Sequence, residues 1–183
     1  MSALRLIEAA EAPLLARPFY VGGDPGPLVG ALAHVPEMLE VAMPFLGAVL
    51  GPSSIPARTK ELVVLRTSAV AECSYCVASH TGVALDTGLE RDEIVALRGE
   101  APLPGAFASP ADLALLAWVD AVAGAGPVPA AVGDGLRLHY PEHEVVELTL
   151  LVGATLMLNR FCTSLGLPVS AELAGRLERE GLR

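Results

Sequence analysis

The chain is poor in the residues that mark several common classes of protein. Among its 183 residues, 12 are Lys or Arg against 21 Asp or Glu, which gives a formal net charge of −9 and a sequence pI of about 4.8. No run of basic residues can neutralise a phosphate backbone, so nucleic acid is excluded as a partner. Aromatic residues make up 4%, charged residues 18% and hydrophobic residues 52%. A core must therefore be built from Ala, Val and Leu on closely packed helices, and we expect part of the apolar surface to lie between subunits of a homo-oligomer.

Long uncharged stretches are also missing. They stop at about a dozen residues or are interrupted by Pro or Gly, short of the roughly 20 residues that cross a bilayer. Glu8 and Glu11 stand where a signal peptide would be apolar. Three cysteines form no disulfide framework, so Cys73 and Cys76 are better explained as a working pair in a reducing compartment. We expect no membrane segment and a cytoplasmic location.

Proline, glycine and capping residues divide the chain into helices. A strand within 145–158 is excluded, because that stretch is longer than ordinary strands and carries only Gly153 as a breaker. No alternating stretch is bounded by hairpin turns, so the fold class is all-α, in a single domain over residues 1–183 with its core at about 28–167. Helices are predicted over 28–50 with breaks or kinks at Pro36 and Pro44, 57–71, 73 to about 88, 90–98, 110–123, 129–139, 142–165 and after Ser170, with a loop over 100–108.

A shift of 86 residues brings two parts of the chain into register. It places Glu61 on Glu147, Cys73 on Asn159, Cys76 on Cys162 and His80 on Gly166. The match predicts an internal repeat of a helix pair in which only the first copy carries the dithiol and the histidine.

The segment from Glu61 to His80 gathers the residues best suited to chemistry. Cys73 and Cys76 stand at a predicted helix start, where unpaired N–H groups and the helix dipole favour a thiolate. His80 follows Cys76 by one turn and can exchange a proton with its thiol. Glu61, near the start of the preceding helix, is expected to fold back alongside His80 to orient it or to pass a proton. The pattern indicates a redox-active dithiol.

Other sites can be built from the same residues. A zinc site uses Cys and His, but it usually draws two ligand pairs from separated segments, and no second pair exists here. Haem attachment is excluded because Val77, not His, follows the second cysteine. A thioredoxin motif requires a preceding strand, which is not predicted. Two buried cysteines that act as small hydrophobes remain an alternative. No cofactor or metal is therefore expected.

Two neighbouring residues are given structural interpretations. Cys162 lies in an apolar helix and is expected to be a core residue rather than a third redox partner. Glu72 is expected to be an acid in the first helical turn, favoured by the dipole.

The spacing of Glu61, eleven residues, Cys73-Ser-Tyr-Cys76, three residues and His80 resembles the signature of the alkylhydroperoxidase D-like branch of the carboxymuconolactone decarboxylase family. Looser similarity extends over about residues 30–170. The resemblance implies an all-helical domain with an internal repeat, assembled as a trimer or a trimer-based hexamer. It also implies a thiol peroxidase or disulfide reductase, with Cys76 as the peroxide-reacting thiol, Cys73 as the resolving thiol, and a proton relay through His80 and Glu61. Alkylhydroperoxidase D proteins have a histidine between the cysteines, where this chain has Tyr75.

Three functions follow from this reading. The leading one is a peroxiredoxin-type antioxidant enzyme that reduces hydroperoxides and is restored by a dithiol protein, either a lipoyl domain or a thioredoxin-like protein. The second is a non-redox decarboxylase or isomerase of a small carboxylated ring, in which His80 and Glu61 exchange protons. The third is an oligomeric binding module whose disulfide acts as a redox switch.

Overall fold

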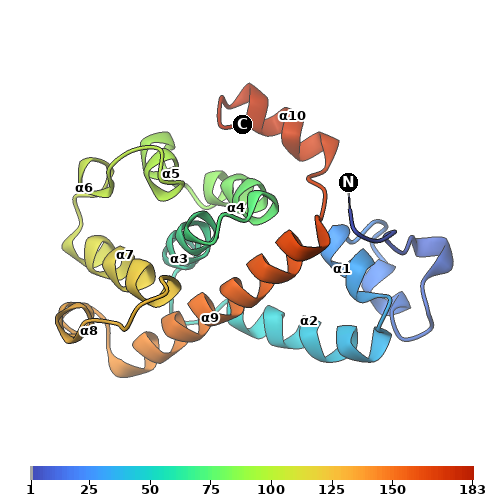
Figure 1. Ribbon diagram of the computed structural model, residues 1–183, viewed down its shortest axis with the longest axis horizontal. Helices are drawn as coiled ribbons and strands as arrows, with labels where there is room; N and C mark the ends of the chain where they lie inside the picture. The colour runs from blue at the N-terminus through green and yellow to red at the C-terminus, as the bar shows by residue number, and fades with distance from the viewer. Residues whose placement is uncertain (1) are drawn as a thin grey trace.

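The longest helix, α9 (Glu142–Leu165), crosses the molecule diagonally in the computed structural model, which describes residues 2–183 (Figure 1). Helix α2 (Pro36–Leu50) lies on one side of it, and α3 (Ala57–Val70) and α4 (Ser74–Asp86) lie on the other. Residues 2–183 contain no strand, which confirms the all-α prediction. The remaining elements are the 3-10 helices η1 (Ala9–Glu11) and η2 (Arg17–Tyr20) and the helices α1 (Pro27–Leu32), α5 (Arg91–Leu97), α6 (Leu103–Ala106), α7 (Pro110–Ala123), α8 (Ala130–Arg137) and α10 (Ala171–Arg179).

The helix ends follow local chemistry. The Ser109 hydroxyl accepts a hydrogen bond from the Asp112 N–H and so caps α7, which begins with a proline at its first position. Ser170 caps α10 in the same way. Helix α9 ends at Gly166, whose φ of 60° places it in the left-handed region where glycine is favoured.

Pro36 and Pro44 were predicted to break or kink the first long helix. Helix α2 is not broken at Pro44, because Pro44 and Glu40 are exposed and water can bond the carbonyl group that loses its N–H partner. Pro36 does mark a break, since it is the first residue of α2. The predicted loop over 100–108 contains the short helix α6, for which the sequence gives only the proline at its start as a signal.

Helix α3 lies at the centre of the core. Its consecutive residues 62–65 are all buried, because α4 and α5 cover one side and α7 and α9 cover the other. This explains why the helix is apolar around most of its circumference rather than along one stripe. Buried side chains also occur outside 28–167, including Ala16 and Tyr20 near the N-terminus and Leu177 in α10.

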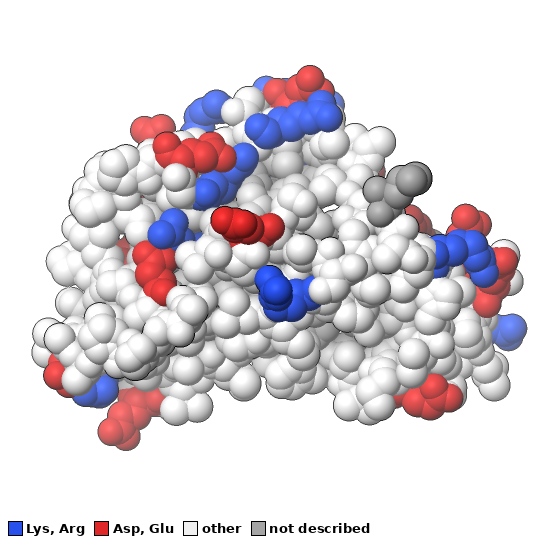
Figure 2. Space-filling model, viewed as in Figure 1, with Lys and Arg blue, Asp and Glu red and all other residues white. Residues whose placement is uncertain are grey.

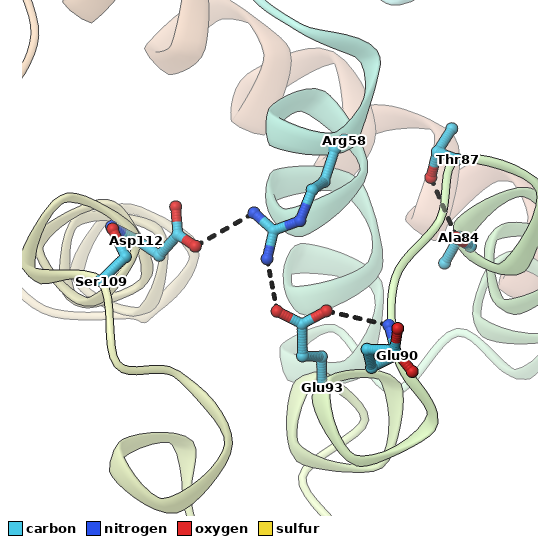
Figure 3. A network of polar contacts seen from close by, with 7 residues as sticks. All are labelled: Arg58, Ala84, Thr87, Glu90, Glu93, Ser109 and Asp112. Atoms are coloured by element: carbon cyan, nitrogen blue, oxygen red, sulfur yellow. Dashed lines mark hydrogen bonds and ion pairs between the residues drawn. The ribbon is translucent and has the colours of Figure 1, made fainter.

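A polar network ties three helices together beside this core. Arg58 of α3 lies between Glu93 of α5 and Asp112 of α7 and forms ion pairs with both (Figure 3). The second carboxylate oxygen of Glu93 accepts the Glu90 N–H at 2.9 Å, which completes a capping box at the start of α5. The network fixes where α5 and α7 lie relative to α3, and therefore the scaffold on which α4 rests.

The surface carries few charges. Figure 2 shows charged side chains over α10, at a few places toward the centre of the view and at its edges, with wide uncharged areas between them. By length and composition alone α9 is apolar enough to cross a membrane. It is the helix against which α2, α3, α4, α7 and α8 pack, so its apolar composition is accounted for by the core. The cytoplasmic location stays a prediction.

The two segments related by the 86-residue shift differ in shape. The first is the hairpin of α3 and α4, which turns at residues 71–73, whereas the second is the single straight helix α9. The paired positions Cys73 and Asn159 are therefore a helix cap in one segment and the interior of a helix in the other.

Candidate functional site

The turn between α3 and α4 creates the site. Helix α3 ends in a Schellman motif, in which the Cys73 N–H bonds the Ser68 carbonyl at 3.1 Å and the Glu72 N–H bonds the Ala69 carbonyl at 3.1 Å. Glu72 occupies the left-handed position with φ 54°, where Gly is usual. The expectation that Glu72 lies in the first turn of the next helix was wrong, because it precedes the N-cap of α4 and belongs to the end of α3.

Cys73 is the N-cap residue of α4, as its position in the sequence predicted. The Cys76 N–H, one of the free N–H groups at the start of α4, is among the groups that lower the pKa of the Cys73 thiol. Cys76 follows in the first turn of α4, so both thiols lie at the positive end of the helix dipole. All three cysteines are free thiols.

The third thiol, Cys162 of α9, joins this pair. All three cysteines are buried and pack in one apolar cluster. The Cys162 thiol packs against Cys73 and Cys76 closely enough to shift the pKa of both. Helix α4 lies against α9, which brings the N-terminus of one helix to the last turns of the other. The site is therefore a cluster of three thiols.

The three thiols differ in protonation. Hydrogen bonds donated by the Cys162 and Cys76 thiols lower the pKa of Cys73, and the Cys76 N–H and the Thr163 hydroxyl lower it further. Donation by Cys162 also works to lower the pKa of Cys76, but the hydrogen bond that Cys76 makes to the Cys73 sulfur and its own burial outweigh this and raise the pKa. Donation to Cys73 and Cys76, followed by burial, raises the pKa of Cys162. The cluster thus favours one thiolate, on Cys73, held by two S–H donors.

His80 lies on α4 one turn after Cys76, and Glu61 of α3 lies next to it. The His80 Nδ1 and the Glu61 Oε2 are 3.0 Å apart, so α3 folds back on α4 as the sequence predicted. Glu61 is buried, and His80 is partly exposed. The carboxylate fixes the orientation of the imidazole. The groups that shift the pKa of Cys76 are Cys162, Cys73 and Asn159, and His80 is not among them.

Asn159 belongs to the candidate site although the sequence did not single it out, whereas Cys162 is buried as predicted and also contacts the pair. Asn159 is fully buried in α9, and its Nδ2 donates to the Ser68 Oγ at 3.0 Å, which ties α9 to the end of α3. A hydrogen bond between the same amide and the Cys76 thiol lowers the pKa of that thiol. The signal that pointed to both residues was the 86-residue shift, which paired them with Cys73 and Cys76.

Tyr75, between the two cysteines, packs on the apolar cluster of the thiols. Burial, together with the charges of the nearby cysteines, raises the pKa of its phenol, so Tyr75 stays neutral near pH 7. Within residues 2–183, no group of three or more His, Cys, Asp or Glu side chains has the arrangement of a metal site, the three thiols included.

An apolar groove of about 390 Å³ lies beside the thiol cluster, between α2 and α9. Its lining includes Leu28 and Phe161, which also pack on the cysteines, and the exposed side chains Met38, Val41 and Met157. Val41 is 69% exposed and lies among other exposed apolar side chains of this groove. The groove is therefore a candidate contact surface next to the site.

Comparison with known proteins gives this geometry a family context. Residues 36–121, which contain Glu61, both cysteines of the pair and His80, match the carboxymuconolactone decarboxylase family. A similar structure is that of a protein of unknown function from Agrobacterium tumefaciens, a candidate antioxidant defence protein AhpD. It has a TM-score of 0.70 and 26% identity, and the match covers 77% of this chain and 96% of that chain.

Two further solved structures are similar at lower identity. An uncharacterised peroxidase-related protein with an alkylhydroperoxidase AhpD core, from Ralstonia eutropha JMP134, has a TM-score of 0.81 at 20% identity and covers 94% of each chain. The debrominase Bmp8 has a TM-score of 0.72 at 18% identity and covers 94% of this chain and 95% of that chain. These findings confirm the family resemblance and the AhpD-like fold.

Proposed function

We propose that this chain, a carboxymuconolactone decarboxylase family protein by the match over residues 36–121, is an oxidoreductase that uses Cys73 and Cys76 to reduce hydroperoxides. The observation that carries the proposal is the pair of buried, contacting thiols at the N-terminus of α4, with the paired His80 and Glu61 one turn away. A thiolate, a neighbouring thiol and a proton carrier are the groups that two-electron reduction of a peroxide requires.

In the proposed cycle, Cys76 attacks the peroxide. It is 6% exposed, whereas Cys73 is fully buried, and it lies on the side of His80. Transfer of its proton to the Cys73 thiolate, along the hydrogen bond that joins them, forms the Cys76 thiolate. This thiolate takes one oxygen atom to become a sulfenic acid, and the leaving alkoxide takes a proton from His80. The Cys73 thiol then displaces water to form the Cys73–Cys76 disulfide, and an external dithiol reduces it.

The test is thiol titration of the reduced protein before and after one equivalent of hydroperoxide, followed by treatment with a dithiol. Two of the three thiols per chain should be lost and then regained. Steady-state consumption of hydrogen peroxide and of an organic hydroperoxide, with a lipoyl domain or a thioredoxin as reductant, identifies the substrates. Retention of all three thiols would contradict the proposal and leave the non-redox decarboxylase or isomerase.

Reductive dehalogenation is a second candidate that the same thiol pair favours. Two thiols can replace a carbon–bromine bond by a carbon–hydrogen bond, with release of bromide and a proton and formation of a disulfide. The debrominase Bmp8, co-crystallised in a variant form with 2,3,4-tribromopyrrole, shares the fold, and the apolar groove beside Phe161 offers a surface for a flat apolar ring. Incubation of the reduced protein with that bromopyrrole, with bromide release and thiol loss measured together, separates this activity from peroxide reduction.

The proposal includes assembly as a homo-oligomer, a trimer or a trimer-based hexamer. The exposed apolar side chains of α2 and α9 support it, because a monomer rarely leaves such a surface open to water. Light scattering at micromolar concentration should give the mass of more than one chain. A monomer would leave this groove free for a substrate or another protein.

A further inference from the structure

Cys162 has a place in the fold that a packing residue would not require. It is 2% exposed, so hydroperoxides and protein reductants in solution do not reach it directly. Its thiol nevertheless contacts both Cys73 and Cys76, and the three side chains pack with Leu167 and Ala31 in one apolar cluster. The groups that Cys162 can react with are therefore the two cysteines of α4.

We propose that Cys162 is a second resolving thiol, which closes a disulfide with Cys76 and so joins α9 to α4. The step rests on the proposed function, because the hydroperoxide supplies the oxidation. The Cys76 sulfenic acid reacts with the Cys162 thiol, a sulfur–sulfur bond forms, the sulfenic S–O bond breaks, and the oxygen leaves as water with the Cys162 proton. The same bridge also forms by exchange, when the Cys162 sulfur attacks Cys76 in the Cys73–Cys76 disulfide and the Cys162 proton passes to the departing Cys73 sulfur.

The two bridges constrain the chain differently. The Cys73–Cys76 disulfide closes a loop of only three residues within one helical turn, so it restricts the unfolded chain little. The Cys76–Cys162 disulfide closes a loop of about 86 residues between two helices and should raise Tm by about 10 °C. Cys162 thus rescues an oxidised Cys76 when Cys73 is not free, at the cost of locking α4 onto α9.

The test uses Cys73→Ser, which leaves Cys76 and Cys162 as the two thiols. Serine is a good N-cap residue, so α4 should still begin at the same place. After one equivalent of hydroperoxide the variant should lose both thiols, and trypsin should release residues 67–91 linked to residues 161–176, because cleavage at Arg66, Arg91, Arg160 and Arg176 separates the two cysteines. Cys73→Ala is the second variant if the serine protein does not fold.

Two readouts decide between a bridge and a mere contact. The linked peptides and a rise in Tm of about 10 °C, reversed by a dithiol and missing in the control Cys73→Ser/Cys162→Ser, would support the proposal. Peptides 67–91 and 161–176 that stay separate, with Cys162 free, would overturn it. A linked species that runs as two chains on a non-reducing gel would also overturn it, because the bridge would then lie between molecules.

Diamide, which oxidises thiol pairs without a peroxide, keeps this result separate from the proposed function. If diamide links the two peptides while hydroperoxide leaves the thiols of the wild type untouched, the Cys76–Cys162 bridge stands and the peroxidase fails. If hydroperoxide closes the Cys73–Cys76 disulfide in the wild type but neither oxidant links the peptides in Cys73→Ser, the peroxidase stands and Cys162 is a packing residue.

Discussion

The hairpin of α3 and α4 and the straight helix α9 carry similar residues in the same order, yet they present them in different environments. In the hairpin the chain breaks at Glu72 and a new helix starts, so Cys73 lies beside the free N–H groups at the start of α4. In α9 the helix continues through the matching positions, and Cys162 lies where every nearby N–H already bonds within the helix. The pKa of Cys73 is lowered and that of Cys162 is raised. One helix break therefore separates a favoured thiolate from a thiol that keeps its proton.

The carboxylates at matching positions differ in the same way. Glu61 pairs with His80, and Glu147 pairs with Lys60 at 2.8 Å. Lys60, the only lysine of the chain, also donates to the Val49 and Gly51 carbonyl groups and so closes the end of α2. The hydrogen bond from Lys60 lowers the pKa of Glu147 and keeps it ionised. The acid of α3 thus faces a histidine of the candidate site, whereas the acid of α9 pairs with the lysine that closes the end of α2.

The largest expected difference is between the cysteines at matching positions. Cys76→Ser removes the proposed attacking thiol and should lower peroxide turnover by about a thousandfold or more, since serine is a far weaker nucleophile. Cys162→Ala should change turnover by no more than about threefold, because Cys73 still resolves the sulfenic acid. Steady-state peroxide consumption measures both. Equal losses in the two variants would mean that α9 supplies part of the catalytic machinery and would break the comparison.

A pH titration examines the thiolate itself. In the reduced wild type, the ultraviolet absorbance of thiolate should show about one thiolate per folded chain at pH 7, because the lowered pKa of Cys73 keeps it ionised as the pH falls below the free value of about 8.5. Cys162→Ala removes one S–H donor and should move the ionisation midpoint up by about one pH unit or more, since a hydrogen bond to a charged group contributes about 1.5 kcal/mol or more.

The control for this titration is Cys73→Ser, in which the low-pH thiolate should disappear. Unfolding the wild type in urea at pH 7 should remove it as well, because the hydrogen bonds and the helix terminus are lost. A wild type with no thiolate at pH 7 would mean that burial outweighs the two donors.

The sequence predicted the parts of the site that depend on local spacing. The start of α4 at Cys73 and the approach of Glu61 to His80 follow from a short turn between two helices and from helical periodicity. The capping signals at Ser109 and Ser170 placed α7 and α10 for the same reason. These features are set within about twenty residues of chain.

The contacts of Cys162 and Asn159 with the pair could not be predicted in this way. They depend on how α9 lies against α3 and α4, which is decided by the packing of the whole core. An apolar helix that contains one cysteine and one asparagine gives no local sign of which residues it will face. Glu72 was misplaced for a different reason, because glycine is the usual signal of a left-handed helix end and a glutamate gives no such signal.

The next largest effect is expected from His80 of α4, whose matching position after α9 is Gly166. In a background with Cys73 and Cys162 replaced by Ser, no Cys73 thiolate can take the Cys76 proton, and His80 is the base that remains one helical turn away. His80→Ala should therefore slow the oxidation of Cys76 by about tenfold near pH 7. The difference should shrink above pH 9, where solvent deprotonates the thiol. Rates of peroxide oxidation against pH measure this, and Glu61→Gln, which keeps the shape of the partner, should give a smaller loss. If the rate curves with and without the His80→Ala change superimposed, His80 would be a structural residue and the proposed proton relay would be rejected.

The smallest expected effect concerns the break between the two helices. Glu72 is exposed and holds φ at 54°, which costs a residue with a Cβ about 1 kcal/mol or more relative to glycine. Glycine relieves this strain but adds entropy to the unfolded chain, so Glu72→Gly should raise the free energy of unfolding by about 0.5 kcal/mol in urea titrations. Glu72→Ala is the matched control, because it removes the charge and keeps the Cβ, and it should give no such gain. If alanine stabilised the protein as much as glycine, charge rather than backbone conformation would be the reason. Neither variant should alter the pKa of Cys73, since the Schellman motif and the N-cap of α4 use backbone groups that both residues retain.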